Sequence, residues 1–271
     1  MPELPEVETT LRGISASILN TKIIQVNIRN PNLRWPIPNQ LPQSLKQQHF
    51  TRIRRRAKYL LLSTTYGTLI IHLGMSGSLR IVPHNTPYDK HDHFELCFAN
   101  NRALRLKDPR RFGAVLWTKD NIGKHHLLAH LGPEPLSPEF NADYLFQLSR
   151  SRKVNIKQFI MDSKVVVGIG NIYANEALFA SGINPKRAAG RISRARYELL
   201  CQNARKILKE AIRQGGTTLR DFTGGDGKPG YFKQELQVYG RKNQPCIQCG
   251  HALKEIRLNN RSTVYCIHCQ K

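Results

Sequence analysis

Apolar residues near the start of the chain recur every three or four positions, at Val7, Leu11, Ile14 and Ile18. That spacing places them on one face of a helix, and Pro5 suits the first helical turn. The pattern predicts an amphipathic helix over residues 5–19.

From residue 23 to residue 117 the pattern changes to short β-rich runs separated by turn residues. Many short strands in one stretch are typical of a β-sandwich or barrel. The predicted strands are Ile23–Ile28, Tyr59–Ser63, Thr68–Leu73, Ser78–Ile81, His93–Ala99, Ala103–Lys107 and Ala114–Trp117.

Proline punctuation between Gly132 and Pro138 predicts a linker, and the chain beyond it reads as helices over residues 141–214. A glycine-rich stretch over 215–230 predicts a mobile loop. The expected fold class is α+β and multidomain, with a helix and β-sandwich first, then a helical domain and a cysteine-bearing finger. The predicted boundaries are 1–132, a linker at 133–140, 141–236 and 237–271.

The composition indicates the chemical class of the binding partner. The 271 residues leave room for about two domains, and 42 Lys and Arg against 19 acids give a formal charge of +23. Such a surplus indicates a polyanion, either nucleic acid or an anionic membrane. No apolar run approaches the ~20 residues that span a bilayer, and the acidic, proline-bearing start is unlike a signal peptide. A soluble intracellular protein is expected.

The last 35 residues contain four of the six cysteines, spaced as Cys246-x2-Cys249-x16-Cys266-x2-Cys269. Two close pairs match a structural zinc site, and disulfides are the alternative, which a reducing compartment disfavours. Arg261 follows Asn259-Asn260, a turn pattern between two candidate strands. It is therefore expected near a hairpin tip, either reaching into a groove or simply solvated. Cys97 and Cys201 are interpreted as packing residues.

Pro2 becomes the terminal residue if the initiator Met1 is removed. Its secondary amine is then a nucleophile that condenses with a sugar aldehyde to give an iminium, although Met-Pro is also simply a common start. Glu3 and Glu6 flank this amine. A carboxylate there can shuttle a proton, or it can merely favour the helix start.

Further basic and glycine-rich segments suit contacts with phosphates. Five cations lie between Arg52 and Lys58, a run that either follows a phosphate track or is a solvated face. Lys58 borders apolar residues and is expected beside a buried site. The glycines before Asn171 expose backbone N–H groups to an anion. His91 and His93 share a strand face without a third metal ligand, which favours a phosphate contact.

Several segments together resemble bacterial formamidopyrimidine-DNA glycosylases, and the likeness runs from residue 2 to the C-terminus. They are Pro2–Glu8, Arg56–Leu60, His72–Gly77, Asp108–Gly113, Gly170–Tyr173 and the four-cysteine finger. The resemblance implies a monomeric bacterial base-excision repair enzyme that acts on 8-oxoguanine and formamidopyrimidines in duplex DNA. It also implies a helix–two-turn–helix domain, DNA in a basic cleft, one structural zinc and no organic cofactor.

The resemblance further implies roles for single residues. Pro2 attacks the sugar C1′ with Glu3 as proton donor and Glu6 in support, after which β- and δ-elimination cut the strand. Lys58 and Arg261 match the residues linked to the two eliminations. The remaining matches are Met75, Arg110 and Phe112 as void-filling residues; His91, Arg152 and Asn171 as DNA contacts; Lys157 near the lesion; and the 215–230 loop as a lid. The segment around Arg152 is less lysine-rich than in some relatives.

Two alternatives remain at this point. An endonuclease VIII-like glycosylase for oxidised pyrimidines shares the proline, the lysine and the finger, but Leu4 and the trio of Met75, Arg110 and Phe112 argue against it. A non-catalytic zinc-ribbon DNA-binding protein fits the charge and the finger, but it leaves Pro2, Glu3 and Lys58 without a purpose.

Overall fold

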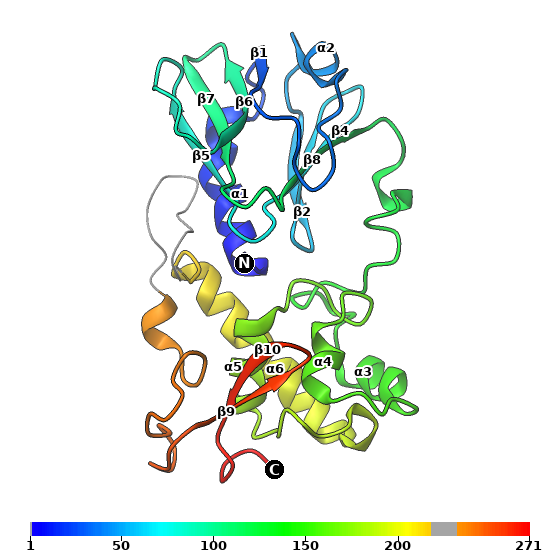
Figure 1. Ribbon diagram of the computed structural model, residues 1–271. Coiled ribbons are helices and arrows are strands. Elements are labelled where there is room, and N and C mark those ends of the chain that lie inside the picture. The colour runs from blue at the N-terminus through cyan, green and yellow to red at the C-terminus, as the bar shows by residue number, and fades with distance from the viewer. Residues whose placement is uncertain (1, 218–231) are drawn as a thin grey trace. The chain divides into compact units, whose positions relative to one another are not determined.

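The structure is a computed structural model that describes residues 2–217 and 232–271. Contacts divide the described chain into two compact units (Figure 1). Among the described residues, unit 1 comprises 2–129 together with 214–217, and unit 2 comprises His130–Arg213 and Phe232–Lys271. Most of the loop expected at 215–230 lies outside the described residues.

Unit 1 begins with the predicted helix, α1 (Leu4–Ile18), which starts one residue earlier than expected. Two antiparallel four-stranded sheets follow, so the predicted sandwich is confirmed. One sheet has the order β1 (Ile23–Ile28), β6 (Asp92–Phe98), β7 (Arg102–Lys107), β5 (Ser78–Pro83). The other has the order β2 (Arg52–Arg56), β3 (Tyr59–Ser63), β4 (Thr68–His72), β8 (Ala114–Thr118).

Two elements of unit 1 were not expected as such. The basic run forms β2, an edge strand with one neighbour, where charged side chains reach solvent readily. A short helix, α2 (Leu41–Leu45), lies between β1 and β2, and its five residues are too few for helical periodicity to reveal. The short 3-10 helix η1 (Ile122–Lys124) follows β8.

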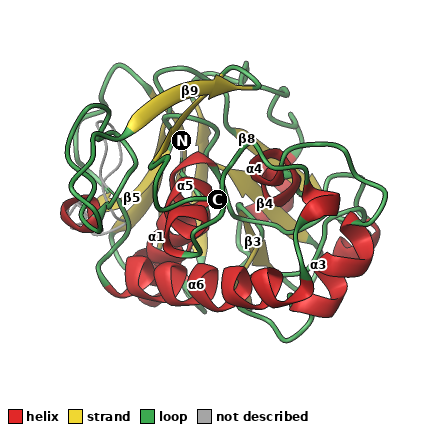
Figure 2. Cartoon of the chain, turned by 90° about the horizontal axis from the view of Figure 1, so that it is seen from below, coloured by secondary structure: helices red, strands yellow, loops and turns green. Residues whose placement is uncertain are grey.

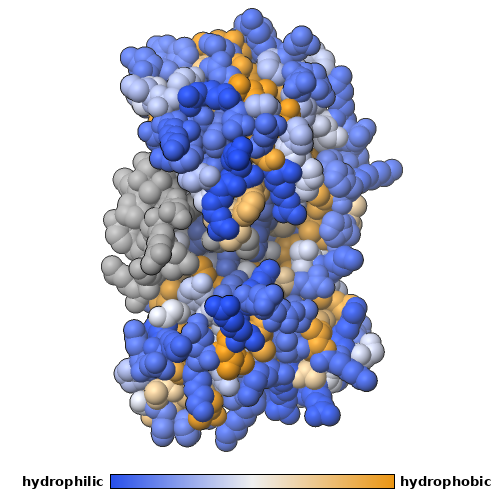
Figure 3. All heavy atoms as spheres, in the orientation of Figure 1, coloured by the Kyte–Doolittle hydropathy of each residue, from blue (hydrophilic) through white to orange (hydrophobic). Residues whose placement is uncertain are grey.

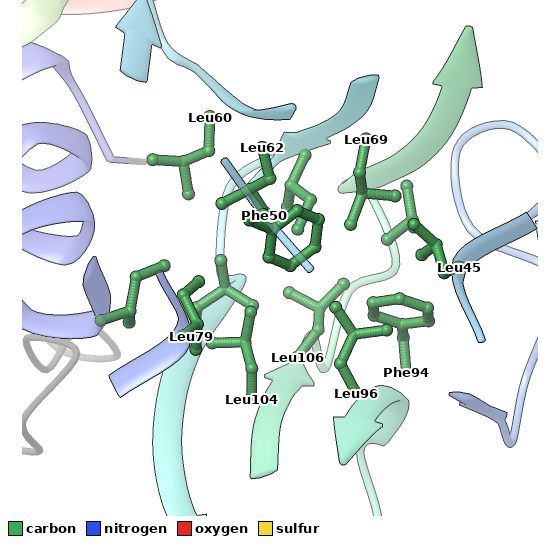
Figure 4. Close-up of a cluster of buried hydrophobic side chains, with 14 of the residues drawn as sticks. Leu45, Phe50, Leu60, Leu62, Leu69, Leu79, Phe94, Leu96, Leu104 and Leu106 are labelled. Atoms are coloured by element: carbon green, nitrogen blue, oxygen red, sulfur yellow. The ribbon is translucent and has the colours of Figure 1, made fainter. Parts of the chain in front are cut away.

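Both sheets contribute to one hydrophobic core (Figure 4). Leu60, Leu62 and Leu69 come from one sheet, and Leu96 and Leu104 from the other; all five are fully buried. Val7, Ile14 and Ile18 add the apolar face of α1 to the same cluster. Burial at about 1.5–3 kcal/mol for each large aliphatic side chain makes this core the main stabiliser of the unit.

The strand register brings several loops to one end of the sandwich. Tyr59 pairs with His72, and His72 pairs with Ala114, so the β2–β3 turn, the β4–β5 loop and the β7–β8 loop share an edge. In the other sheet Lys107 pairs with both Ser78 and Asp92, which brings the start of β6 to that same edge. We call this edge the loop end of unit 1.

Unit 2 contains the predicted helices and finger. The helices are α3 (Ala142–Ser149), α4 (Ile156–Met161), α5 (Asn171–Ala180) and α6 (Arg194–Arg213), with short 3-10 turns η2 (Ala189–Arg191) and η3 (Phe232–Glu235). The long α6 is the most extended helix in Figure 2 and packs against α3 and α5. The finger hairpin is β9 (Lys254–Leu258) and β10 (Arg261–Tyr265). No helix among the described residues is long and apolar enough to cross a membrane.

Candidate nucleic-acid interface

The first residues of unit 1 form a tight, buried helix start. Pro2, Glu3 and Glu6 are buried, and the Glu3 backbone N–H donates to Glu6 Oε2 at 2.8 Å within a capping box. Glu6 Oε1 also accepts from the Thr217 N–H at 2.8 Å. Glu6 therefore ties the N-terminal segment to the residue that precedes the undescribed 218–231. While Met1 is attached, the Pro2 nitrogen is an amide, so a nucleophilic amine requires removal of Met1.

Lys58 lies in the β2–β3 turn at the loop end, after Ala57 in the left-handed region at φ 54°. Arg55 Nε donates to Glu8 Oε2 at 3.0 Å, which fastens β2 to α1. This ion pair is largely buried and holds the turn against the helix that follows Pro2.

His72 is a neutral ring beside this lysine. Burial and then the charges of Lys58 and Arg34 lower the pKa of His72 to about 4. Its Nδ1 accepts from the Gly74 N–H at 3.0 Å, which fixes the proton on Nε2. His72 thus supports the turn that leads to Met75.

Two large hydrophobic side chains at the loop end are exposed: Met75 is 41% exposed and Phe112 is 46% exposed. They project from the β4–β5 and β7–β8 loops, and the Arg110 guanidinium lies 5.0 Å from the Phe112 ring centroid. Figure 3 shows hydrophobic surface bordered by hydrophilic side chains on this unit. The three predicted void-filling residues are therefore brought together, with apolar groups presented to solvent and a cation beside them.

The two histidines of the 91–93 segment have different environments. His93 is buried, and its Nε2 donates to the Asp108 carbonyl at 3.0 Å, because a carbonyl oxygen can only accept. His91 is partly exposed, and the centroid of its ring lies 6.2 Å from that of His93. Only His91 is thus positioned to meet a ligand from solvent.

A pocket of about 520 Å³ in unit 2 brings together three of the predicted DNA-contacting residues: Arg152, Lys157 and Arg261. Arg152 and Arg261 are exposed. Arg261 directly follows a two-residue turn in which Asn259 and Asn260 have φ 49° and 59°. The expectation that Arg261 lies at a hairpin tip is confirmed by this turn.

Lys157 differs from a surface phosphate contact. It is 2% exposed, and its Nζ donates to the Ser262 carbonyl at 2.8 Å and to Thr263 Oγ1 at 2.7 Å. Asn175 Oδ1 accepts from the Val264 N–H at 2.9 Å and adds a second link from the helices to β10. The ammonium therefore holds the hairpin in place on α4, although one side of Lys157 also borders the pocket.

Asn171 is the first residue of α5 and follows the extended cap residue Gly170. Its side chain is partly exposed, while its Oδ1 atom is buried without a hydrogen-bond partner among the described residues. An amide at a helix start can contact a phosphate beside the backbone N–H groups of the first turn.

The four finger cysteines fit a zinc ion. Their Sγ atoms lie within 4.8 Å of one another, with Cys246 and Cys269 at 3.9 Å and Cys249 and Cys266 at 3.4 Å. Tetrahedral ligation at a Zn–S distance of about 2.3 Å requires S···S separations of about 3.8 Å. Four thiolates close the coordination sphere, so the zinc is structural. Val238, Leu253 and Val264 complete the small core beside it.

Local sequence patterns missed several residues that shape these sites. Arg34 and Lys58 come near enough to His72 to lower its pKa only in the folded unit. Glu176 on α5 is buried and accepts the N–H groups of Gln237, Val238 and Tyr239 at 2.8–3.0 Å. Burial raises the pKa of this carboxyl, although the three N–H donors oppose the shift. Only long-range contacts reveal these roles.

Comparison with known proteins identifies the family. Residues 1–115 match the formamidopyrimidine-DNA glycosylase N-terminal domain, 131–223 match its H2TH domain, and 243–271 match a zinc finger found in FPG and IleRS. The formamidopyrimidine-DNA glycosylases of Marinomonas sp. and Cellvibrio japonicus are each 58% identical over 100% of both chains. The chain belongs to the formamidopyrimidine-DNA glycosylase family.

Solved structures of formamidopyrimidine-DNA glycosylases share the fold. The Lactococcus lactis protein in complex with N7-benzyl-Fapy-dG-containing DNA has a TM-score of 0.92 and 32% identity, covering 100% of both chains. Its complex with abasic-site DNA has a TM-score of 0.92 and 32% identity, covering 99% of both. The Thermus thermophilus protein has a TM-score of 0.89 and 34% identity, covering 99% of this chain and 98% of that one.

Proposed function

We propose that the protein is a bifunctional DNA glycosylase and AP lyase that removes oxidised purines from duplex DNA in base-excision repair. The observation that supports this most is the loop end of unit 1. There, exposed Met75 and Phe112 lie with Arg110, on the edge that also bears Lys58 and His91. Together with the family membership, this arrangement suits an enzyme that displaces a base and holds the surrounding backbone.

The chemistry begins at Pro2 once Met1 has been removed. The lone pair of the Pro2 nitrogen attacks the sugar C1′, the bond from C1′ to the damaged base breaks, and Glu3 supplies a proton as the base leaves. The Pro2 nitrogen then loses its proton, and its lone pair breaks the bond from C1′ to the ring oxygen O4′, which takes up a proton, so that an iminium joins Pro2 to an open-chain sugar. This iminium withdraws electrons from the sugar, so a proton is lost from C2′ and the 3′ phosphate departs by β-elimination. A second, δ-elimination expels the 5′ phosphate.

Base displacement is assigned to the trio at the loop end. Moving a base out of the stack costs a few kcal/mol and leaves a gap in the duplex. Phe112 wedges between base pairs, and Met75 fills the vacated space. Arg110 donates to the orphaned cytosine, which gives a physical reason to prefer lesions opposite cytosine.

The remaining residues hold the backbone. Lys58 and His91 on unit 1, with Arg152, Asn171 and Arg261 on unit 2, present cations and donors to phosphates, which position DNA without reading its sequence. Lys58 and Arg261 are further assigned to the β- and δ-elimination steps. Lys157 supports the hairpin that carries Arg261. The zinc, when bound, stabilises that same hairpin.

A paired-substrate assay tests this specificity. Duplexes of one sequence carry either 8-oxoguanine opposite cytosine or thymine glycol opposite adenine, and excision is followed under single-turnover conditions. We expect faster excision of 8-oxoguanine and a product cut on both sides of the sugar. Oxidised pyrimidine is a necessary comparison, because the Lactococcus lactis relative also forms a complex with oxidised-pyrimidine DNA. Preferential excision of thymine glycol would favour the endonuclease VIII-like alternative.

We further infer that the enzyme acts as a monomer on the chromosome in the bacterial cytoplasm. The inference rests on its DNA substrate and on the family, since repair of genomic DNA requires access to the nucleoid. Fractionation of cells that express the chain with a C-terminal tag tests this location. Recovery of the protein outside the DNA-containing fraction would contradict it.

A further inference from the structure

We infer that Asp108 is a positioning residue that holds Met75, Arg110 and Phe112 in one rigid arrangement at the loop end. This inference rests on the proposed function, because it concerns how the three void-filling side chains are held in position relative to one another. Asp108 itself is fully buried, directly after β7, and touches no solvent.

The two carboxylate oxygens of Asp108 join the two loops that carry the trio. Ser76 Oγ, next to Met75, donates to Asp108 Oδ1 at 2.8 Å. The Gly113 N–H, next to Phe112, donates to Asp108 Oδ2 at 2.8 Å. One carboxylate therefore fixes the neighbour of each exposed hydrophobic residue.

Arg110 is held through the same group. Its backbone N–H donates to Ser76 Oγ at 3.2 Å, while the hydroxyl hydrogen of Ser76 points to Asp108. The chain of hydrogen bonds thus runs from Arg110 through Ser76 to Asp108. A change at Asp108 alters the hydroxyl orientation on which the Arg110 backbone depends.

The backbone of Asp108 extends the arrangement to the histidine segment. Its N–H donates to the His91 carbonyl at 3.0 Å, and its carbonyl accepts from His93 Nε2 at 3.0 Å. Arg111, in the left-handed region at φ 56°, also donates its N–H to this carbonyl at 3.1 Å. Asp108 is therefore in contact with every loop-end segment that carries a proposed DNA contact, apart from the β2–β3 turn.

Close backbone packing makes the arrangement rigid. A Cβ added at Gly74 would lie 2.4 Å from the Phe112 carbonyl carbon, and Gly74 has φ +60°. A Cβ added at Gly113 would lie 2.9 Å from Asp108 Oδ2. The Met75 and Phe112 loops thus interlock at two glycines, and the carboxylate occupies the space beside them.

A carboxylate at position 108 suits the joining of the two loops better than a neutral amide would. Among the described residues no cation forms an ion pair with the carboxylate, so its burial depends on hydrogen-bond donors. Asparagine has one acceptor oxygen and one donor group, so it can accept from Ser76 or from Gly113 but not from both. The other contact is then lost or reversed.

Asp108→Asn tests the inference with two substrates. The first is 8-oxoguanine opposite cytosine, which requires base displacement, and the second is a preformed abasic site in the same duplex, which does not. We expect the single-turnover excision rate to fall roughly tenfold or more, the equivalent of about 1.4 kcal/mol, and strand cutting at the abasic site to change by less than about twofold.

Two further variants make the test specific. Glu95→Gln is the matched control, because Glu95 is also a buried carboxylate of unit 1 but bonds to Arg105, Tyr88 and Asn27. In Glu95→Gln, the rate of 8-oxoguanine excision and the rate of cutting at the abasic site should change by the same factor. Ser76→Ala removes the same link with a smaller change, so it decides the matter if Asp108→Asn fails to fold, and we expect a loss of about threefold on 8-oxoguanine alone.

The outcomes distinguish this inference from the proposed function. If the wild-type protein excises no 8-oxoguanine, the proposed function fails. If it does, and both rates fall equally in Asp108→Asn or Ser76→Ala, Asp108 has only a general structural role. A double variant with Arg110→Ala adds a check, because the Asp108→Asn effect should shrink once Arg110 is absent. Full additivity would also overturn the inference.

Discussion

At the scale of single residues, the loop end combines a charged lysine with a neutral histidine. His72 packs against the Tyr59 ring at a centroid distance of 4.8 Å and accepts from Gly74, so its uncharged form is built into the turn before Met75. A protonated His72 would be repelled by the charges of Lys58 and Arg34. Its Nδ1 would also carry a proton and could no longer accept the hydrogen bond from Gly74. Acid should therefore weaken this part of the molecule before it affects the core.

The lowered pKa of His72 predicts a pH-dependent stability. The folded value is about 4 and the ordinary value 6.5, so between these limits the unfolded chain binds a proton that the folded chain does not. Stability is complete above about pH 6.5 and falls as the pH drops towards 4, by about 2 kcal/mol after allowing for partial exposure of the ring.

Urea unfolding at several pH values, compared with His72→Asn, measures this contribution. Asparagine keeps an acceptor near the Nδ1 position but does not titrate, so the difference in unfolding free energy between the two proteins should vary with pH only in this window. A constant difference would contradict the assignment of a neutral, buried His72.

Several of the proposed site residues can be identified from the sequence, and others cannot, for a physical reason. Pro2, the four cysteines and Arg261 are marked by position, spacing and a local turn. Asp108 and His72 lie within recognisable motifs, yet their partners, such as Ser76 and Lys58, meet them only across strands. The exposure of Met75 and Phe112 likewise depends on the completed fold, because either side chain suits a core equally well.

At the level of secondary-structure elements, the loop end and the finger hairpin are alike. In each, hydrogen-bonded strands form a rigid scaffold that holds exposed side chains. The strands of the sandwich other than β2 were predictable because β-rich runs and turn residues are local features, and the hairpin was predictable from Asn259-Asn260. The role of Lys157 was not, because sequence alone places a lysine on the surface. Its burial follows from the acceptors Ser262 and Thr263 on β10.

Lys157→Met distinguishes support of the hairpin from contact with DNA. Methionine keeps most of the buried chain but loses both hydrogen bonds, so we expect weaker DNA binding with an unchanged dependence on salt. Arg152→Ala, which removes a proposed phosphate contact, should instead make the slope of log affinity against log salt shallower by about 0.9. A similar reduction in Lys157→Met would show that its ammonium neutralises a phosphate.

Zinc binding is predicted to depend on the four finger cysteines alone. Cys249→Ala should lower the zinc content from about one ion per chain towards zero and increase amide exchange across the β9–β10 hairpin, since so small a core depends on the metal. Elemental analysis and hydrogen exchange measure both effects. Cys201→Ala, a buried cysteine in α6, is the matched control and should retain zinc. Full zinc content in Cys249→Ala would refute the ligand set.

At the scale of the whole molecule, the formal charge of +23 implies DNA binding dominated by counterion release. If about six phosphates are neutralised, log affinity should fall against log salt with a slope near −5. Titration of one duplex at several salt concentrations measures the slope. A value near zero would mean that the basic surface does not face the phosphate backbone.

The predicted linker lies close to the point at which the contacts divide the chain. Proline punctuation predicts a linker at 133–140, whereas the contacts divide the chain between Ala129 and His130. The reason is packing: the Gly132 N–H donates to the Ser163 carbonyl at 2.8 Å, and the Pro133 carbonyl accepts from Val167 at 3.1 Å. The proline-rich segment thus belongs to unit 2, a feature that composition does not reveal.

The amine of Pro2 is proposed to form the covalent intermediate, and borohydride trapping on an 8-oxoguanine duplex tests this assignment. We predict a trapped protein–DNA adduct, and mass spectrometry should locate the attachment of the DNA at residue 2. The adduct should be absent in a chain whose N-terminus is blocked by a retained tag, and reduced in Pro2→Gly, which keeps a primary amine at the terminus in place of the secondary one. It should persist in Pro5→Ala, which changes a proline of the same segment. A full yield of adduct from the blocked chain would show that another residue is the nucleophile.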